Sequence, residues 1–465
     1  MNISVFVIAL FVLQAICLVV GHRAAKKLST QDDYFLAGRG IRFFPLLMTL
    51  IATQIGGGLI LGSAEEAYRY GWYVLFYPLG ACLGLLLLAA GIGKRLSQFK
   101  VSTIAQLFEE IYQSVRLKKV ASILSIISLF MILIAQVIAS KKFLISLGVT
   151  QNWIFAAFWA IVIIYTVTGG LKAVVATDII QALFFISVFV ACFVYSVWSE
   201  PALLSQMTYV GSGEGFDFDQ NKVMGWLLMP LLFMVIEQDM AQRCFAAKSG
   251  KVVSWASGCS ALCIILVCAI PVFYGILGKA MGLHIPEGSS VLMTVLMAKT
   301  TPVLSALFGC AIVAAVISTA DSLMNAISSN IAQDFNFKWS TQKNGVKVSQ
   351  AITCGIGCLA LLGSFFFSNV VGILIISYEL SVSCLFVPVF AALFIRSGNP
   401  YSATGAVVLG AAGFVLFQWM PVTIIPKEIA SLLLSLTGYL GGELYSRISA
   451  KTSVEAQRAK FHSES

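Results

Sequence analysis

Apolar residues occur along the chain in blocks of about twenty, the length of helix that crosses the hydrocarbon core of a bilayer. Short polar stretches separate the blocks, so each block predicts one membrane-spanning helix. The first block lacks a basic segment before it, which favours a retained span over a cleaved signal peptide. Thirteen spans are predicted, at about residues 2–21, 43–70, 72–93, 120–147, 153–168, 174–198, 223–240, 252–278, 303–332, 348–367, 370–395, 402–420 and 428–446.

The composition supports a polytopic all-α membrane protein. Of the 465 residues, 59% are hydrophobic and 11% are charged, whereas roughly a quarter of residues are charged in soluble domains. The net charge of +9 comes from basic residues in the gaps between apolar blocks, which is the positive-inside pattern and not a nucleic-acid-binding surface. We therefore expect one transmembrane domain over 1–465, in a plasma membrane such as a bacterial inner membrane, with the lipid bilayer as a partner and no nucleic acid.

The distribution of basic residues predicts the orientation. An odd number of spans places the two termini on opposite sides of the membrane. Most of the 30 Lys and Arg residues lie in loops on the side of the C-terminus. We therefore expect the N-terminus outside and a cytoplasmic tail at 447–465.

The stretch at 50–71, LIATQIGGGLILGSAEEAYRYG, predicts a broken helix. Three consecutive glycines, Gly56, Gly57 and Gly58, interrupt an apolar segment at bilayer depth. Backbone leaves the helical ladder there only where it is buried in protein or lines a cavity. Carbonyl groups released by such a break can coordinate a cation. Close packing of helices on small residues is the alternative interpretation.

Ionisable and hydroxyl residues inside spans are candidates for function, because they are expensive in a membrane. In the span 303–332, Ser318, Thr319 and Ser322 place three hydroxyl groups within about one helical turn, beside Asp321. Hydroxyl and carbonyl oxygens suit a small hard cation, whereas the alternative is a hydrogen-bonded contact between helices. The other intramembrane candidates are Glu65, Glu66, Lys141, Lys142, Asp178, Glu237, Asp239 and Glu379.

The sequence contains no pattern that predicts an enzyme. HExxH is absent, and the three histidines fall in predicted loops or termini. Most of the 11 cysteines lie singly in apolar blocks, where free Cys behaves as a small hydrophobe. We expect a protein that is not an enzyme and that has no cofactor.

Four segments together resemble the sodium:solute symporter family: the broken helix at 50–71, TGGLKAVVATDIIQ at 168–181, EQDMAQRCFAAKS at 237–249 and AAVISTADS at 314–322. IGGGLILGSAEEAY and STADS are most similar to the choline-transporter-like branch. The resemblance implies a LeuT-type fold with two inverted five-helix repeats at 43–198 and 223–395. An extra helix at 2–21 precedes them, and two peripheral helices follow at 402–446.

The resemblance also implies ion sites. The coupling ion is Na⁺, the only metal expected, and its core site would use the carbonyl groups of Ala52, Ile55 and Ala315 with the hydroxyls of Ser318 and Thr319. Some members have a second sodium site one layer nearer the cytoplasm. That pattern would fall on Ser318, Thr319, Ser322 and Asp178, with Asp321 close by.

The substrate region implied by the resemblance is a set of polar and aromatic positions. Choline transporters of this type have tryptophans where this chain has Gln54 and Glu237, which removes an aromatic cage for a quaternary ammonium. An amide and a carboxylate favour a solute with hydrogen-bond donors, such as an amine, although sugar-transporting relatives also have polar residues there. The full set is Gln54, Gly56, Gly57, Gly58, Phe76, Tyr77, Gln136, Glu237, Gln238 and Glu379.

The sequence thus predicts a sodium-coupled symporter that imports a small polar organic solute by alternating access, and functions as a monomer. An amino-containing or zwitterionic solute is favoured, and a sugar or carboxylate remains an alternative. Proton coupling through the acidic residues of the spans, or a sodium-independent channel or uniporter on the same fold, are the competing mechanisms.

Overall fold

The computed structural model describes residues 1–26, 31–167, 169–201, 203, 216–335, 345–396, 398–419 and 425–463. Within them the protein is helical, with one isolated parallel bridge between Ile41 and Ala247. Nine described helices are long and apolar enough to cross a membrane, or ten if one bent pair counts as a span. The polytopic class agrees with the sequence, whereas the number of thirteen and the orientation of the termini stay predictions.

The first half of the chain begins with a peripheral helix and then enters the bundle. Its elements are α1 (Ile3–Ala25), α2 (Gln31–Leu36), η1 (Ala37–Arg39), α3 (Phe43–Gln54), η2 (Gly58–Gly62), α4 (Ser63–Tyr70), η3 (Gly71–Leu75), α5 (Phe76–Leu87), η4 (Leu88–Ile92), α6 (Gly93–Leu96), α7 (Gln106–Tyr112), α8 (Val115–Ser146), α9 (Asn152–Val167) and α10 (Gly170–Ser199).

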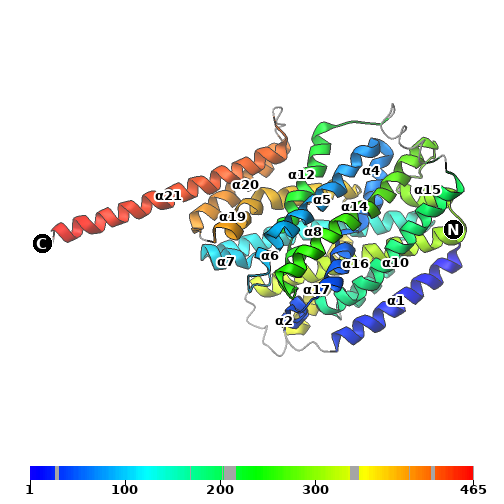
Figure 1. The fold of residues 1–465 in the computed structure, drawn as a ribbon, viewed down its shortest axis with the longest axis horizontal. Helices are drawn as coiled ribbons and strands as arrows, with labels where there is room; N and C mark the ends of the chain where they lie inside the picture. The colour runs from blue at the N-terminus through cyan, green and yellow to red at the C-terminus, as the bar shows by residue number, and fades with distance from the viewer. Residues whose placement is uncertain are drawn as a thin grey trace.

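The second half completes the bundle and ends in a long helix. Its elements are α12 (Gln220–Ile236), α13 (Gln238–Ala246), α14 (Gly250–Ala280), α15 (Val291–Lys299), α16 (Pro302–Asp334), α17 (Gly345–Gly363), α18 (Val370–Ser381), η5 (Val382–Phe386), α19 (Val387–Ile395), α20 (Pro400–Trp419) and α21 (Lys427–Ser463). Helix α21 continues beyond the predicted end of the last span at 446, and its C-terminal part projects away from the bundle (Figure 1).

Helix α16 lies at the centre of the bundle and α1 at its edge (Figure 1). In the most apolar window of each helix, 83% of residues are buried in α16 and 17% in α1. Helix α16 begins at the N-cap Thr301, whose side chain accepts a hydrogen bond from the amide of Leu304, and Pro302 follows at the first helical position. Pro at that position leaves no further amide unpaired. A central helix carrying several hydroxyl groups is therefore in contact with protein and not with lipid.

The glycine run breaks the helix between α3 and η2, as predicted. Ile55 leaves the helical conformation with φ −81° and ψ 80°. The space around the glycines explains their identity, because neighbouring helices approach the backbone closely. A Cβ atom at Gly57 would stand 2.4 Å from Ala139 Cβ, and one at Gly58 would stand 2.3 Å from Leu374 Cδ1. Helices α8 and α18 can reach this backbone only where side chains are missing.

A second break separates α12 from α13. The two helices are bent by 42°, and Glu237 at the junction has an extended backbone with ψ 121°. The sequence predicted that this span ends near 240 and that the next begins near 252, which leaves Arg243 in the loop between them. That prediction is wrong, because α13 continues through Ala246 and the Arg243 side chain is fully buried. Short polar helices look like loops by hydropathy, although tertiary contacts bury them.

Candidate ion and solute sites

The broken helix and α16 meet at four of the five oxygens expected to bind sodium. Ser318 Oγ donates to the carbonyl oxygens of Ala52 and Ala315, each at 2.9 Å. Thr319 Oγ1 contacts the same two oxygens at 3.3 and 3.1 Å. Ile55 caps the end of α3 one turn beyond Ala52. These are neutral, hard oxygen donors, which fit a small monovalent cation.

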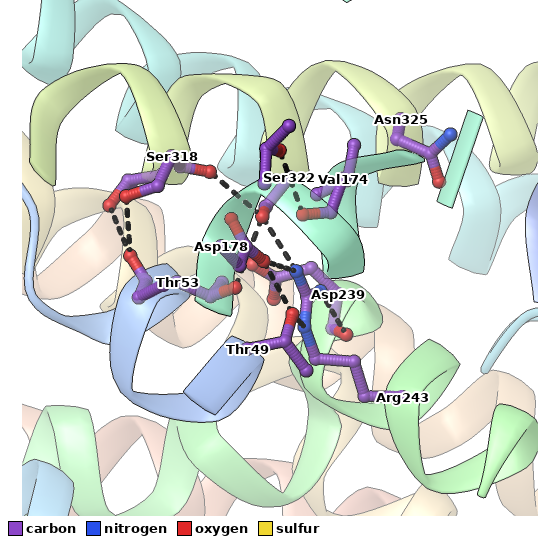
Figure 2. Close-up of polar contacts among 12 residues, drawn as sticks. Thr49, Thr53, Val174, Asp178, Asp239, Arg243, Ser318, Ser322 and Asn325 are labelled. Carbon is purple, nitrogen blue, oxygen red and sulfur yellow. Dashed lines mark hydrogen bonds and ion pairs between the residues drawn. The ribbon is translucent and has the colours of Figure 1, made fainter. Parts of the chain in front are cut away.

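A buried arginine cluster lies one turn along α16 from this set (Figure 2). Arg243 of α13 donates to Ser322 Oγ at 2.6 Å and to Thr49 Oγ1 at 3.0 Å, and its guanidinium is 3.6 Å from Asp178 Oδ2. Thr49 donates to the same carboxylate oxygen at 2.5 Å. Arg243 also donates to the carbonyl oxygen of Asp239 at 3.0 Å. One cation thus joins side chains from α3, α10 and α16.

The residues of the expected second sodium site do not form one site in this structure. Asp178 and Ser322 come together, but the Arg243 guanidinium lies between them and supplies a positive charge. Asp321 accepts a hydrogen bond from Thr166 of α9 instead. It lines a separate cavity of about 390 Å³ beside α1.

Ser322 connects the oxygens expected to bind sodium with the arginine cluster. Its hydroxyl donates to the carbonyl oxygen of Ser318 at 2.9 Å and lies 3.0 Å from Thr53 Oγ1 of α3. The expected sodium site and the arginine cluster therefore share one helical turn of α16. A movement of α3 against α16 changes both.

Six of the ten predicted substrate positions line one central pocket: Gln54, Gly56, Gly58, Tyr77, Gln136 and Glu237. Its free volume is about 30 Å³, enough for little more than a water molecule. The walls are therefore closed around the site in this conformation, and a solute requires them to open. Thr319, one of the residues expected to bind sodium, also lines the pocket, so the expected ion and solute sites share a residue.

Two hydrogen bonds organise the pocket. Gln54 Nε2 donates to Glu237 Oε2 at 3.1 Å, which joins the two helix breaks across the pocket. The amide of Gly57 donates to Gln136 Oε1 at 2.7 Å, which replaces a bond lost at the break. Gly57 thus holds the pocket wall although it does not line the cavity.

Three predicted substrate residues lie elsewhere. Gln238 accepts from the amide of Ile104 at 2.7 Å and donates to the carbonyl oxygen of Ser102 at 3.1 Å. Glu379 pairs with Lys427 at 3.0 Å. Phe76 at the start of α5 does not line the pocket and is 37% exposed.

The predicted substrate set left out two polar or aromatic residues that line the pocket, Asp239 and Tyr378. Phe233 stacks on Tyr378 with ring centroids 4.5 Å apart. The sequence named Asp239 as an intramembrane candidate but did not assign it to the substrate, although it belongs to the same polar run as Glu237. Tyr378 had no such signal, since an aromatic residue in an apolar span usually packs in the core.

Comparison with known proteins identifies the family. The profile of the sodium:solute symporter family matches residues 34–410. The chain is 22% identical over 439 residues to the sodium/pantothenate symporter of Haemophilus influenzae, covering 88% of this chain and 90% of that protein. It is 27% identical over 450 residues to the high affinity choline transporter 1 of Homo sapiens, covering 87% and 75%.

Solved structures show the same fold. A substrate-bound, outward-open Na⁺-coupled sialic acid symporter superposes with a TM-score of 0.78 at 18% identity, covering 95% of this chain and 97% of that one. Mhp1, a nucleobase-cation-symport-1 family transporter in a closed conformation, gives a TM-score of 0.59 at 14% identity, covering 88% and 94%. With the matched profile, these findings show that the chain belongs to the sodium:solute symporter family, has the LeuT-type fold and is a multi-pass, Na⁺-coupled symporter of a small solute.

Proposed function

We propose that the protein imports a small solute carrying a protonated amine, and that Glu237 is the principal group that recognises it. Glu237 and Asp239 both line the central pocket, and none of the described lining residues is Lys or Arg. Asp239 Oδ2 has no hydrogen-bond partner among the described residues. Its other oxygen accepts from the amide of Met240 at 2.9 Å, and a buried carboxylate oxygen without a partner is costly. An ammonium group in the pocket offsets that cost.

The other polar groups of the pocket fit a hydrogen-bonding solute. Gln54, Gln136 and Tyr77 offer an amide, a second amide and a hydroxyl. Tyr378 and Met234 supply apolar surface on the opposite elements. This mixture suits a primary or secondary amine, including a zwitterion, better than a quaternary ammonium, which has no N–H to donate.

In this proposal Na⁺ binds between α3 and α16, held by Ala52, Ile55, Ala315, Ser318 and Thr319. An inside-negative potential favours its entry by about 2.3 kcal/mol per charge per 100 mV. Bound Na⁺ draws α3 toward α16. Because Thr319 also lines the solute pocket, the same movement shapes the solute site. Such coupling is reciprocal, so the solute also tightens Na⁺ binding.

The remaining features complete the proposal. The inverted repeats are 43–198 and 223–395, and both begin with a broken helix. The N-terminus lies outside, the C-terminal tail lies in the cytoplasm, and the protein works as a monomer in a bacterial inner membrane. It uses no cofactor and carries out no catalysis.

Uptake into proteoliposomes with an imposed sodium gradient tests the proposal. Labelled ethanolamine, choline, proline, other amino acids, pantothenate and a sugar are compared, each also with potassium and with a pH gradient. We expect sodium-driven accumulation of an amine-containing compound. Accumulation of a neutral sugar alone rejects the amine, and accumulation driven only by pH moves the coupling to protons.

The variant Glu237→Gln sharpens the result. It keeps the shape and the hydrogen bond to Gln54 but removes the charge. We expect the apparent affinity for the amine to fall about tenfold, the loss of one charge-assisted hydrogen bond. The matched control is Glu443→Gln, because Glu443 lies near the middle of α21, does not line the pocket and pairs with Arg447. Equal affinity in both variants removes Glu237 from the solute site.

A further inference from the structure

Another cavity, of about 350 Å³, lies away from both the central pocket and the cavity beside α1. It opens where the starts of α12, α18 and α21 meet the end of α20, on the side expected to face outward. Lys222, Trp226, Ile375, Gln418, Lys427 and Glu428 are among its lining residues. Of the residues that the structure describes, none lines both this cavity and the central pocket. We call it the outer cavity.

The two lysines of the outer cavity are already paired. Lys222 lies 2.7 Å from Glu66 Oε2. Lys427 lies 3.0 Å from Glu379 Oε2, which also accepts a hydrogen bond from Gln418 at 3.0 Å. These pairs neutralise the positive charge that the lysines bring. Any further carboxylate in the cavity is therefore in excess.

Two further carboxylates line the cavity: Asp219, which accepts hydrogen bonds from the amides of Asn221 and Lys222 as the N-cap of α12, and Glu428. Glu428 is only 4% exposed. Its Oε2 atom has no hydrogen-bond partner among the described residues, and neither has the second oxygen of Glu379. One oxygen of each of these buried carboxylates therefore lacks a contact that would offset its desolvation. Carboxylates thus outnumber lysines in and around the cavity.

The size and walls of the cavity point to the kind of cation. A volume of about 350 Å³ lies in the range of pockets for small organic molecules. It far exceeds what a dehydrated metal ion fills. Trp226 and Ile375 add an apolar wall next to the carboxylate. A cation with a short hydrocarbon body satisfies both surfaces.

We propose that the outer cavity binds a small organic ammonium ion, with Glu428 as its anionic partner. The site is distinct from the solute pocket and does not depend on the proposed solute. Its ligand contacts α12 and α18 of the bundle together with α20 and α21. Binding therefore ties the last two helices to the part of the protein that carries the solute pocket.

Equilibrium dialysis of the purified, detergent-solubilised full chain with labelled ethylamine tests this site. The Glu237→Gln variant serves as the background, because it weakens the central pocket, and the buffer contains potassium and no sodium. We expect saturable binding of one ethylammonium per chain. Adding Glu428→Gln weakens it about tenfold or more, because a charge-assisted contact is lost. Adding Glu443→Gln on the same helix leaves it unchanged.

A second variant guards against misfolding of Glu428→Gln. Gly225 faces Glu428, since a Cβ there would stand 3.1 Å from Glu428 Oε1. Gly225→Leu fills the cavity and keeps every charge, so we expect it to abolish binding as well. Absence of saturable binding in the background variant overturns the proposal. So does binding that survives either Glu428→Gln or Gly225→Leu in a folded protein, whatever solute is transported.

Discussion

The proposed sodium site, called here the sodium set (Ala52, Ile55, Ala315, Ser318 and Thr319), and the arginine cluster are neighbours on α16. Their buried oxygens nevertheless find partners in opposite ways. The sodium set consists of neutral oxygens, in which hydroxyls of Ser318 and Thr319 meet main-chain carbonyl groups. The arginine cluster contains a carboxylate, Asp178, and a permanent cation, Arg243, on a neighbouring helix. A neutral oxygen set can accept and release an ion, whereas a covalently held guanidinium cannot leave.

The difference suggests a division of roles between the two groups. The sodium set is suited to a mobile coupling ion. The arginine cluster is suited to hold α3, α10, α13 and α16 together during the cycle, in the place where some relatives are expected to bind a second sodium ion. Four predictions test this comparison.

Replacement of Arg243 has the largest expected effect. Arg243→Met leaves the buried Asp178 without a counter-charge, which costs about 3–5 kcal/mol of stability. We expect a large drop in the melting temperature in detergent and loss of uptake. The double variant Asp178→Asn with Arg243→Met removes both charges and should recover most of the stability. If the single variant melts like the wild type, Arg243 does not hold the cluster together.

Replacement of the hydroxyls in the sodium set comes next. Ser318→Ala or Thr319→Ala should raise the sodium concentration for half-maximal uptake about tenfold, the loss expected for one contact to a charged ligand. The melting temperature should change little, since neither substitution leaves a buried charge without its partner. Ser305→Ala, at a buried hydroxyl on the same helix, is the matched control. Unchanged sodium dependence in both site variants would remove this site assignment.

The coupling ratio sharpens the comparison further. If Arg243 replaces a second sodium ion, uptake should move one Na⁺ per solute, and the sodium dependence should have a Hill coefficient near one. Measuring the reversal potential of transport in proteoliposomes gives this ratio directly. A ratio of two would mean that a second ion binds in spite of the guanidinium.

The smallest effect is expected at the link between the two groups. Thr53→Val removes the contact to Ser322 while preserving shape. We expect about a threefold rise in the half-maximal sodium concentration, because one neutral hydrogen bond contributes about 0.5–1.5 kcal/mol. Sodium-dependent uptake of the Val variant is compared with that of Thr53→Ser, which keeps the hydroxyl. Identical values for the two variants would show that the groups act independently.

The candidate sites were only partly predictable. The break at Gly56 to Gly58 was predictable, because glycine lacks a Cβ atom and its backbone can leave the helical conformation. This depends only on the residues at the break itself. Glu379 had the same intramembrane signature as Glu237, yet one pairs with Lys427 and the other lines the pocket. Hydropathy places both at bilayer depth but carries no information about which neighbour each one meets.

The sequence by itself determined the membrane class, the first helix break and the hydroxyl pair at Ser318 and Thr319, because these depend on the length of apolar blocks and on adjacent residues. Only the tertiary structure decided that Arg243 lies against Asp178, 65 positions earlier in the chain, and that it is fully buried. A helical pattern indicates which face of a helix is buried. Pairing of charges depends on which other helix covers that face, and that is settled when the whole bundle packs.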